Sequence, residues 1–536
     1  MSAAIVVAIA LLVALVASNA RRGWTATFVA LVGLAACALA AAWEPSLSTL
    51  TLGGATFALV PRGAQITAVS AISLLLVAVS GLSAAQTGRP SPARPRATPL
   101  EPRVAAAPAL ALAAVAASLA ALNGSLMTPP SGSNAQFQVA GTAGPPLVIA
   151  IVVATAALLA PLVVSGSGSG QETPAAGTAG RLLRITTVAG ALGIVGAAWL
   201  LGPSGPVAPD PAGAAAALLL GAGALALFMG AIPVHSVAAR AAVTGPLALV
   251  GARAVWLPTV FALGVIAWEQ RLFAPAVALG AAGDASLVGG VRLLILAVAL
   301  VSIAGGAIVA WLHDDLRHVL AYVLISDAGL ALLALSAADP AGAAAASSWL
   351  PANALARTAF TAWIAACAAA WGTSRVADLG GWARRAPVLA LGLVAVALAT
   401  FGLPGWGIFA LRASLARAGG GSFEILALAA AWLGLLPFLR LAWIGLQRPT
   451  ATVQAGRGER IARAAPGLPS SRSSTTRPEL GPRRAVAGSR TRAAVERTAA
   501  TLVANGALLA ATAALLAGLL AVAVSLTVGG APVAVD

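Results

Sequence analysis

The residues of this sequence that could do chemistry are a few charged side chains within long apolar stretches. Asp327 lies about half-way along the apolar stretch 318–337, and Arg253 about half-way along 244–267. Arg357 lies within the stretch 350–372, and Arg412 follows FGLPGWGIFAL. A charge at the middle of a bilayer costs roughly 2.5–3.5 kcal/mol on insertion scales, so its presence indicates a role. These residues predict ion pairs, or the binding and transfer of ions or protons.

Each of these charges also has a plainer interpretation. Asp327 is either functional or ion-paired, because a short carboxylate side chain cannot reach far toward the membrane surface. Arg253 either pairs with an acid on a neighbouring helix or extends its guanidinium toward the interface. Arg357 and Arg412 lie near the ends of their predicted spans, so extension toward the interface is an alternative to function for both.

Two histidines and three prolines accompany these charges. His235 and His318 can change charge near neutral pH, although both lie close to a predicted membrane face and could be plain interfacial residues. Pro233, Pro258 and Pro404 can each interrupt a membrane helix. An interrupted helix frees backbone groups and orients half-helix dipoles, and transporters place ion sites there.

The elements that must position these residues are membrane helices. Of the 536 residues, 60% are hydrophobic and only 9% are charged, whereas a soluble domain carries about a quarter charged residues. The composition predicts an all-α, polytopic membrane protein of about 14 transmembrane helices, some of them broken, with a short re-entrant or strand-like piece at 51–61. The predicted spans are 3–20, 24–43, 65–83, 104–124, 146–165, 182–202, 213–234, 244–267, 288–312, 318–337, 350–372, 387–410, 423–446 and 499–528.

The distribution of arginine predicts the orientation of these spans. Arginines gather in alternate loops, beginning with Arg21 and Arg22 and ending in the long loop before the last span. The excess of positive residues marks the cytoplasmic side, so both termini are expected outside, in a bacterial-type inner or plasma membrane. The net charge of +16 lies mainly in these loops, which favours contact with anionic lipid over nucleic acid.

Five regions follow from the same reading. Residues 1–84 hold the first three spans, and 85–103 form a basic, Pro-rich cytoplasmic linker. Residues 104–446 form the core of spans 4–13. Residues 447–498 form an Arg-rich cytoplasmic loop, predicted to be disordered because it contains few apolar residues. Residues 499–536 contain the last span.

Motifs for soluble catalysis are missing from the sequence. It contains no P-loop, no glycine-rich dinucleotide motif between a strand and a helix, no zinc motif and no nucleophile elbow. We therefore predict no catalytic residue, no metal site and no cofactor bound by this chain.

Three segments together resemble the antiporter-like subunits of respiratory complex I, a family that includes subunit N of NADH-quinone oxidoreductase and the Mrp-type antiporters. The segment DLRHVLAYVLISDAGLALLAL (315–335) is similar to the signature of the family's tenth span, with Arg317, Tyr322 and Gly329 in register. The segment 380–415 is similar to the family's twelfth span and its proline-containing break, and 230–250 to its V-P-F-H motif.

The resemblance implies a fold, a function and partners. It implies a proton-translocating membrane subunit N that couples quinone reduction to proton transfer, with partner subunits handling NADH and quinone. This chain would be at most a non-catalytic subunit of that oxidoreductase, surrounded by lipid and by other membrane subunits. The residues it implies as candidates for a proton relay are His235, Arg253, His318, Asp327 and Arg412.

Several relay positions of the family differ in this sequence. The family's seventh-span Lys falls at Phe228 and its eighth-span Lys near Pro258, while Asp327 replaces the tenth-span His and Arg412 the twelfth-span Lys. Lys can lose its proton when buried, whereas Arg remains charged. Asp327 is therefore the expected proton carrier, with Arg253 and Arg412 as fixed charges. Two alternatives stay open, namely a non-pumping structural subunit and a stand-alone secondary ion or proton transporter.

Overall fold

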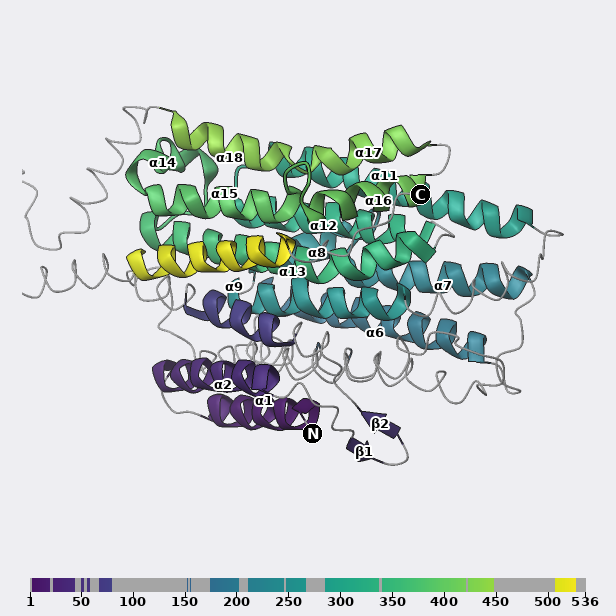
Figure 1. Ribbon diagram of the computed structural model, residues 1–536, viewed down its shortest axis with the longest axis horizontal. Coiled ribbons are helices and arrows are strands. Elements are labelled where there is room, and N and C mark those ends of the chain that lie inside the picture. The colour runs from purple at the N-terminus through teal and green to yellow at the C-terminus, as the bar shows by residue number, and fades with distance from the viewer. Residues whose placement is uncertain are drawn as a thin grey trace, which may run out of the picture.

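The fold is a bundle of membrane helices that run roughly parallel to one another (Figure 1). It is seen in a computed structural model. The structure describes residues 2–19, 23–43, 50–52, 55–57, 67–79, 152, 155, 174–201, 211–244, 247–266, 285–336, 340–420, 423–447 and 507–526.

The N-terminal part contains three helices and a small hairpin. Helices α1 (Ser2–Asn19) and α2 (Gly23–Trp43) pack against each other, and a shorter apolar helix covers Thr67–Val79. Strands β1 (Leu50–Leu52) and β2 (Ala55–Phe57) form an antiparallel pair, and in sequence they lie between α2 and the shorter helix. The described residues of the predicted spans 3–20, 24–43 and 65–83 are therefore helical, and the paired strands confirm a strand-like structure at the described residues 51–52 and 55–57.

The remaining helices form the main bundle. Its elements are α6 (Pro174–Leu201), α7 (Pro211–Met229), α8 (His235–Thr244), α9 (Leu247–Val250), the π-helix η2 (Gly251–Trp256), α11 (Ala285–Leu312), α12 (Leu316–Ser336), α13 (Pro340–Trp371), the 3₁₀-helix η4 (Val376–Leu379), α14 (Trp382–Arg385), α15 (Pro387–Phe401), α16 (Gly407–Gly420), α17 (Glu424–Leu433) and α18 (Leu436–Leu446). The helix begun by η2 continues to Ile266, and a last helix covers Ala507–Leu526.

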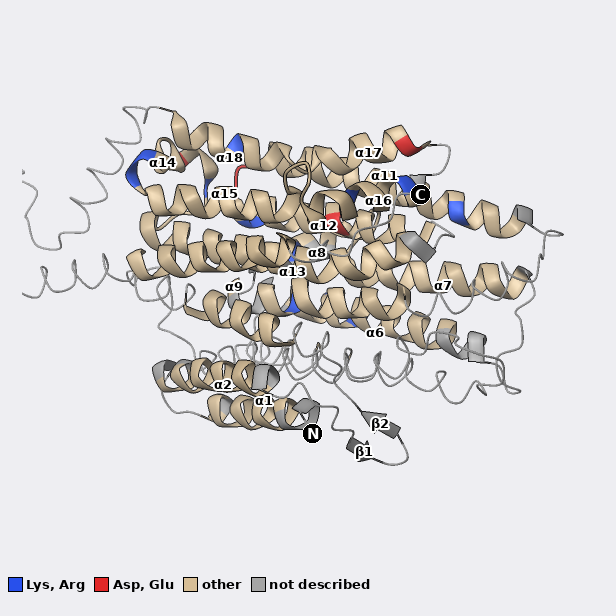
Figure 2. Ribbon diagram, in the orientation of Figure 1, with Lys and Arg blue, Asp and Glu red and all other residues tan. Residues whose placement is uncertain are grey.

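Hydropathy and burial together place this bundle in a membrane. Seven helices of the described residues are long and apolar enough to cross a bilayer. Within the apolar stretches of α12 and α13, 89% and 83% of the residues are buried, compared with 33–44% in the other five, so these two helices form the centre. Side chains such as Leu293, Leu312 and Ile425 are exposed on the outer helices, and charged residues are sparse along the ribbons (Figure 2). The outer face is thus apolar, as contact with lipid requires.

One predicted span is two helices in the structure. The stretch 387–410 was expected to be a single span with an interruption at Pro404, but α15 ends at Phe401 and α16 begins only at Gly407. Gly402 and Gly405 have φ angles of 69° and 93°, a conformation that favours glycine. The glycines and the proline between them thus make a full break, which leaves Arg412 in the second turn of a new helix.

Helices α11 and α12 approach each other closely at two glycines. A Cβ atom on Gly306 would lie 2.7 Å from both the Ser326 nitrogen and the Tyr322 carbonyl oxygen. On Gly329 it would lie 2.6 Å from the Ala299 carbonyl oxygen. These distances confirm, at these two positions, that glycine permits close helix packing.

Gly306→Ala is therefore expected to lower the free energy of unfolding by about 1–3 kcal/mol, because the backbone of α12 would have to move. The measurement is thermal unfolding of the purified chain in detergent. Gly290→Ala is the matched control in α11, since nothing described lies within 4 Å of its added Cβ; it should be neutral or slightly stabilising. Equal destabilisation by both substitutions would contradict the close-packing role of Gly306.

Some sequence predictions lie outside the described residues. These are the span 104–124, the linker 85–103, the loop 448–498 and nearly all of the span 146–165. The number of 14 spans and the five-region division therefore stay predictions.

Candidate charge-transfer site

The centre of the bundle contains a buried ion pair between Asp327 and Arg357. Asp327 lies on α12 and is 3% exposed, and Arg357 lies on α13 and is 2% exposed. The Arg357 Nε donates to Asp327 Oδ2, and its Nη2 donates to Oδ1 over 2.9 Å. Two parallel hydrogen bonds of this kind fix the relative orientation of both groups. The structure therefore supplies the partner that a buried carboxylate needs.

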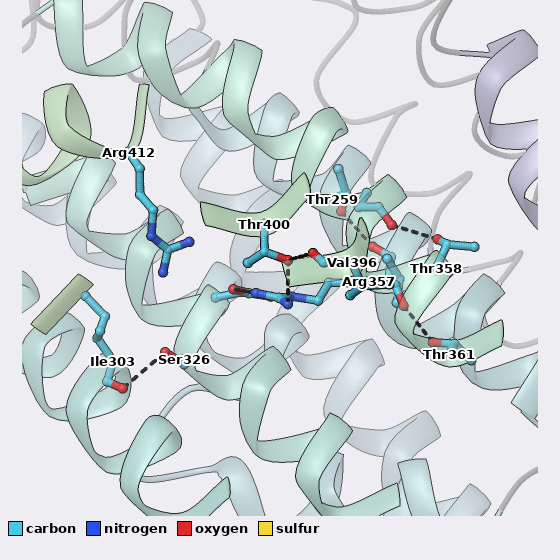
Figure 3. A network of polar contacts seen from close by, with 12 residues as sticks. Thr259, Ile303, Ser326, Arg357, Thr358, Thr361, Val396, Thr400 and Arg412 are labelled. Carbon is cyan, nitrogen blue, oxygen red and sulfur yellow. Dashed lines mark hydrogen bonds and ion pairs between the residues drawn. The ribbon is translucent and has the colours of Figure 1, made fainter. Parts of the chain in front are cut away.

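The second half of the Arg357 environment comes from α15. Arg357 Nη1 donates to Thr400 Oγ1 over 3.3 Å, and Thr400 itself donates to the Val396 carbonyl oxygen of its own helix (Figure 3). Helix α13 begins at Pro340, ten residues before the predicted span, so Arg357 lies in the middle of a 32-residue helix. Extension of Arg357 toward the interface, one of the two sequence interpretations, is wrong for this reason.

Arg412 is a third buried charge, on α16, and is 1% exposed. Its Nε and Nη2 donate to the carbonyl oxygen of Ala431 on α17 over 3.1 and 2.6 Å. The guanidinium carbon lies 4.6 Å from the centroid of the Phe401 ring, a cation–π contact. Its Nη1 is buried without a hydrogen-bond partner among the described residues. Extension toward the interface is thus wrong for Arg412 as well.

The three charges act on one another. Arg412 interacts electrostatically with Asp327 and with Arg357, and Figure 3 shows its side chain extending from a separate segment toward the same interior region. Two guanidinium groups and one carboxylate leave an excess of one positive charge in an interior with little water. The two positive groups therefore attract negative charge at the position of Asp327.

Arg253 lies apart from this cluster on a distorted turn. It is 6% exposed on η2, where the Leu257 amide donates to the Ala252 carbonyl oxygen five residues earlier. Pro258 has no amide hydrogen and cannot complete the ordinary helical bond, which accounts for the π-type turn before it. The expected interruption at Pro258 is therefore a local widening, and the helix continues to Ile266.

No hydrogen bond or ion pair joins Arg253 to another residue in the part of the chain that the structure describes. The expected acidic partner for it is therefore not found among those residues. Helix α13, which carries Arg357, packs directly on η2. The structure thus places Arg253 beside the helix of the ion pair, without direct contact to Asp327.

The remaining predicted residues lie in the break before α8, at the start of α8 and in the first turn of α12. Pro233 follows a cis peptide bond in the break between α7 and α8, and His235 begins α8. His318 lies in the first turn of α12 and is 34% exposed. Sequence reasoning left out His313, which stacks on His318. Its signal was present in the sequence, because the chain has only three histidines and two of them lie five positions apart.

Arg412 also gives a prediction of its own. Arg412→Lys should lower the free energy of unfolding by about 1 kcal/mol, because an ammonium cannot make both bonds to Ala431 and stack flat on Phe401. Thermal unfolding in detergent measures the effect, with the exposed Arg417→Lys as the control. A variant as stable as the native chain would show that the planar contacts contribute nothing.

Comparison with known proteins places this site within a family domain. Residues 215–419 match the family described as NADH:quinone oxidoreductase/Mrp antiporter, TM. The three resembling segments, 230–250, 315–335 and 380–415, all lie inside this match. The match covers the part of the chain that contains Arg253, Asp327, Arg357 and Arg412.

Individual relatives agree with this assignment. The chain is 36% identical over 130 residues to NADH-quinone oxidoreductase subunit N 2 of Syntrophobacter fumaroxidans, a match that covers 24% of this chain and 26% of that protein. It is similar to a chain of the Mrp complex from Dietzia sp., with a TM-score of 0.59 and 20% identity over 83% of this chain and 79% of the other. It is also similar to a chain of respiratory complex I from Thermus thermophilus, with a TM-score of 0.53 and 20% identity, over 95% of this chain and 97% of the other. At these identities the two structures show the fold alone.

Proposed function

We propose that this chain is a proton-translocating, antiporter-like membrane subunit of a complex I-type or Mrp-type assembly. The observation that carries the proposal is the buried pair of Asp327 and Arg357, with Arg412 in electrostatic range, inside the antiporter-like domain. Buried ionisable groups in a membrane helix bundle are retained for ion or proton transfer more often than for stability. Asp327 is the group in this cluster whose charge can change, because Arg stays protonated.

The pair has two arrangements that a proton can exchange. With Asp327 ionised, Arg357 is held by two bonds to the carboxylate. A proton on Asp327 removes the negative charge, and the two guanidinium groups then repel each other without compensation. Arg357 is thereby released from α12, and loss of the proton restores the pair. Opening and closing of one ion pair thus links proton movement to the packing of α12 against α13.

The finer assignment is to the subunit N type. The sequence match to an NADH-quinone oxidoreductase subunit N supports it. In this proposal the chain lies in a bacterial-type plasma membrane with both termini outside and contacts lipid and other membrane subunits. NADH and quinone would be handled by those partners, because this chain contributes no cofactor-binding motif.

A non-pumping structural subunit is the second candidate, and one observation favours it. Phe228, at the position of the family's seventh-span Lys, stacks on Phe261 with ring centroids 4.7 Å apart. An aromatic pair cannot carry a proton, so this part of a family-type relay would be interrupted. A stand-alone transporter is the third candidate, and its substrate would be anionic to suit Arg253 and Arg412.

Two measurements distinguish these candidates. The tagged chain is isolated from its native membrane in mild detergent and its partners are identified by mass spectrometry. The isolated assembly is then placed in liposomes, and proton uptake driven by a potassium diffusion potential is followed with a trapped pH dye. Partner subunits with proton uptake above that of empty liposomes would support the proposal, and partners without uptake would support the structural role. Recovery of the chain alone would contradict an assembly and favour a stand-alone transporter.

A further inference from the structure

All three histidines of the chain and its only tyrosine meet at one end of α12. The His313 and His318 rings stack with centroids 4.8 Å apart and an interplanar angle of 9°. The Tyr322 ring also stacks on the His313 ring, with centroids 4.9 Å apart and an interplanar angle of 13°. His235 borders Tyr322, with centroids 6.2 Å apart. The four aromatic side chains come from α8, α12 and the turn that joins α11 to α12.

The turn that carries His313 is held firmly in place. Asp315 caps α12, since its Oδ1 accepts the Arg317 amide over 2.8 Å, and its Oδ2 accepts the Ser374 hydroxyl. Arg440 on α18 donates to the carbonyl oxygens of Trp311 and His313 at the end of α11. These hydrogen bonds fix the turn, and the His313 ring that it carries is therefore held in position.

This cluster leads along α12 toward the ion pair. His318, Tyr322 and Ser326 are spaced four residues apart and share one face of the helix. Tyr322 precedes Asp327 by five residues, a rise of about 7.5 Å. The Ser326 hydroxyl donates to the Ile303 carbonyl oxygen, which keeps a polar group at the crossing of α11 and α12. Polar side chains are thus spaced along α12 between its partly exposed end and the turn that carries the buried carboxylate.

We propose that His313, His318 and Tyr322 form a proton port, through which protons pass between the aqueous side and the Asp327–Arg357 pair. The proposal rests on the proposed function and adds the site at which protons enter or leave. His318 is 34% exposed and Asp315 29% exposed, so water reaches the port. The Nδ1 atoms of His318 and His235 are buried without a hydrogen-bond partner among the described residues, and the His318 Nδ1 lies 3.7 Å from Asp315 Oδ1, an ion pair when the ring is protonated.

The charges around the port make its two imidazoles dependent on each other. Asp315 from the cap of α12 and Arg440 from α18 act electrostatically on His313, and Arg440 also pairs with Asp314. Burial lowers the pKa of His313, and the positive charge of His318 lowers it too, with Asp315 raising it and Arg440 lowering it. A second proton on the stacked pair is therefore bound less tightly than the first.

The three histidines make this testable by magnetic resonance. The full-length chain, labelled with ¹³C and ¹⁵N at histidine, gives three imidazole signals that can be titrated. His318→Gln should move the His313 titration to higher pH, because the positive charge that lowers the pKa of His313 is removed. His235→Gln, the matched control, should leave the His313 titration in place. If His318→Gln leaves the midpoint of the His313 titration unchanged, the proposal of a proton port is wrong.

Proton uptake into liposomes separates failure of the port from failure of the proposed function. In the same assembly, the rate of proton uptake with the double variant His313→Gln/His318→Gln should be at least about tenfold lower than with the unsubstituted chain. Tyr322→Phe keeps the ring stack without the hydroxyl and reports whether that group takes part. Full uptake by the double variant would overturn the port while the proposed function stands. Absence of uptake by the unsubstituted chain would defeat the proposed function, and the port with it.

Discussion

Arg357→Met is expected to lower the free energy of unfolding of this chain by about 3–5 kcal/mol, the usual result of removing one partner from a buried ion pair. Asp327 is 3% exposed and would lose the two hydrogen bonds from Arg357. Water cannot replace those bonds at the centre of the bundle, and Arg412 is bound to the Ala431 carbonyl. The midpoint of thermal unfolding in detergent measures the loss.

A double substitution tests whether the loss arises from the pair. Arg357→Met/Asp327→Leu removes both charges and should recover most of the stability, because an apolar pair of similar size leaves no unpaired charge at these two positions. Arg417→Met is the matched control, since its partner Glu424 and Arg417 are 51% and 65% exposed; it should change stability by less than about 1 kcal/mol. Additive effects of the two buried substitutions would contradict a coupled pair.

Hydropathy predicted the helices of the centre, and the membrane cost of charge predicted that Asp327 is either functional or ion-paired. The identity of the partner could not be predicted, because the Ala- and Ser-rich stretch 340–349 has low hydropathy and the predicted span began at residue 350. Helix α13 in fact begins at Pro340. Because the predicted start of this helix was ten residues too late, Arg357 was predicted near the end of its span, whereas it lies at the centre of the bundle.

The position of Arg412 was misjudged for a related reason. A window of apolar residues continues across Gly402 and Pro404, so hydropathy alone does not show where one helix ends and the next begins. The two glycines with positive φ were the better signal. Contacts between segments distant in sequence, such as Arg357 with Thr400 or Arg440 with the His313 carbonyl oxygen, have no local signal and depend on the folded bundle.

Asp327→Asn is expected to reduce proton uptake into liposomes at least about tenfold, a change equal to only about 1.4 kcal/mol in the barrier. Asparagine is nearly the same size and can still accept a hydrogen bond from Arg357, but it cannot bind and release a proton. Glu424→Gln, which removes an exposed carboxylate of the same bundle, is the control and should transport normally. Normal uptake by Asp327→Asn would show that the carboxylate is not the proton carrier and that the pair serves packing. Because Arg357 and Arg412 stay charged, a chain that has lost Asp327 retains two positive groups at its centre, and these would repel a proton arriving from either side.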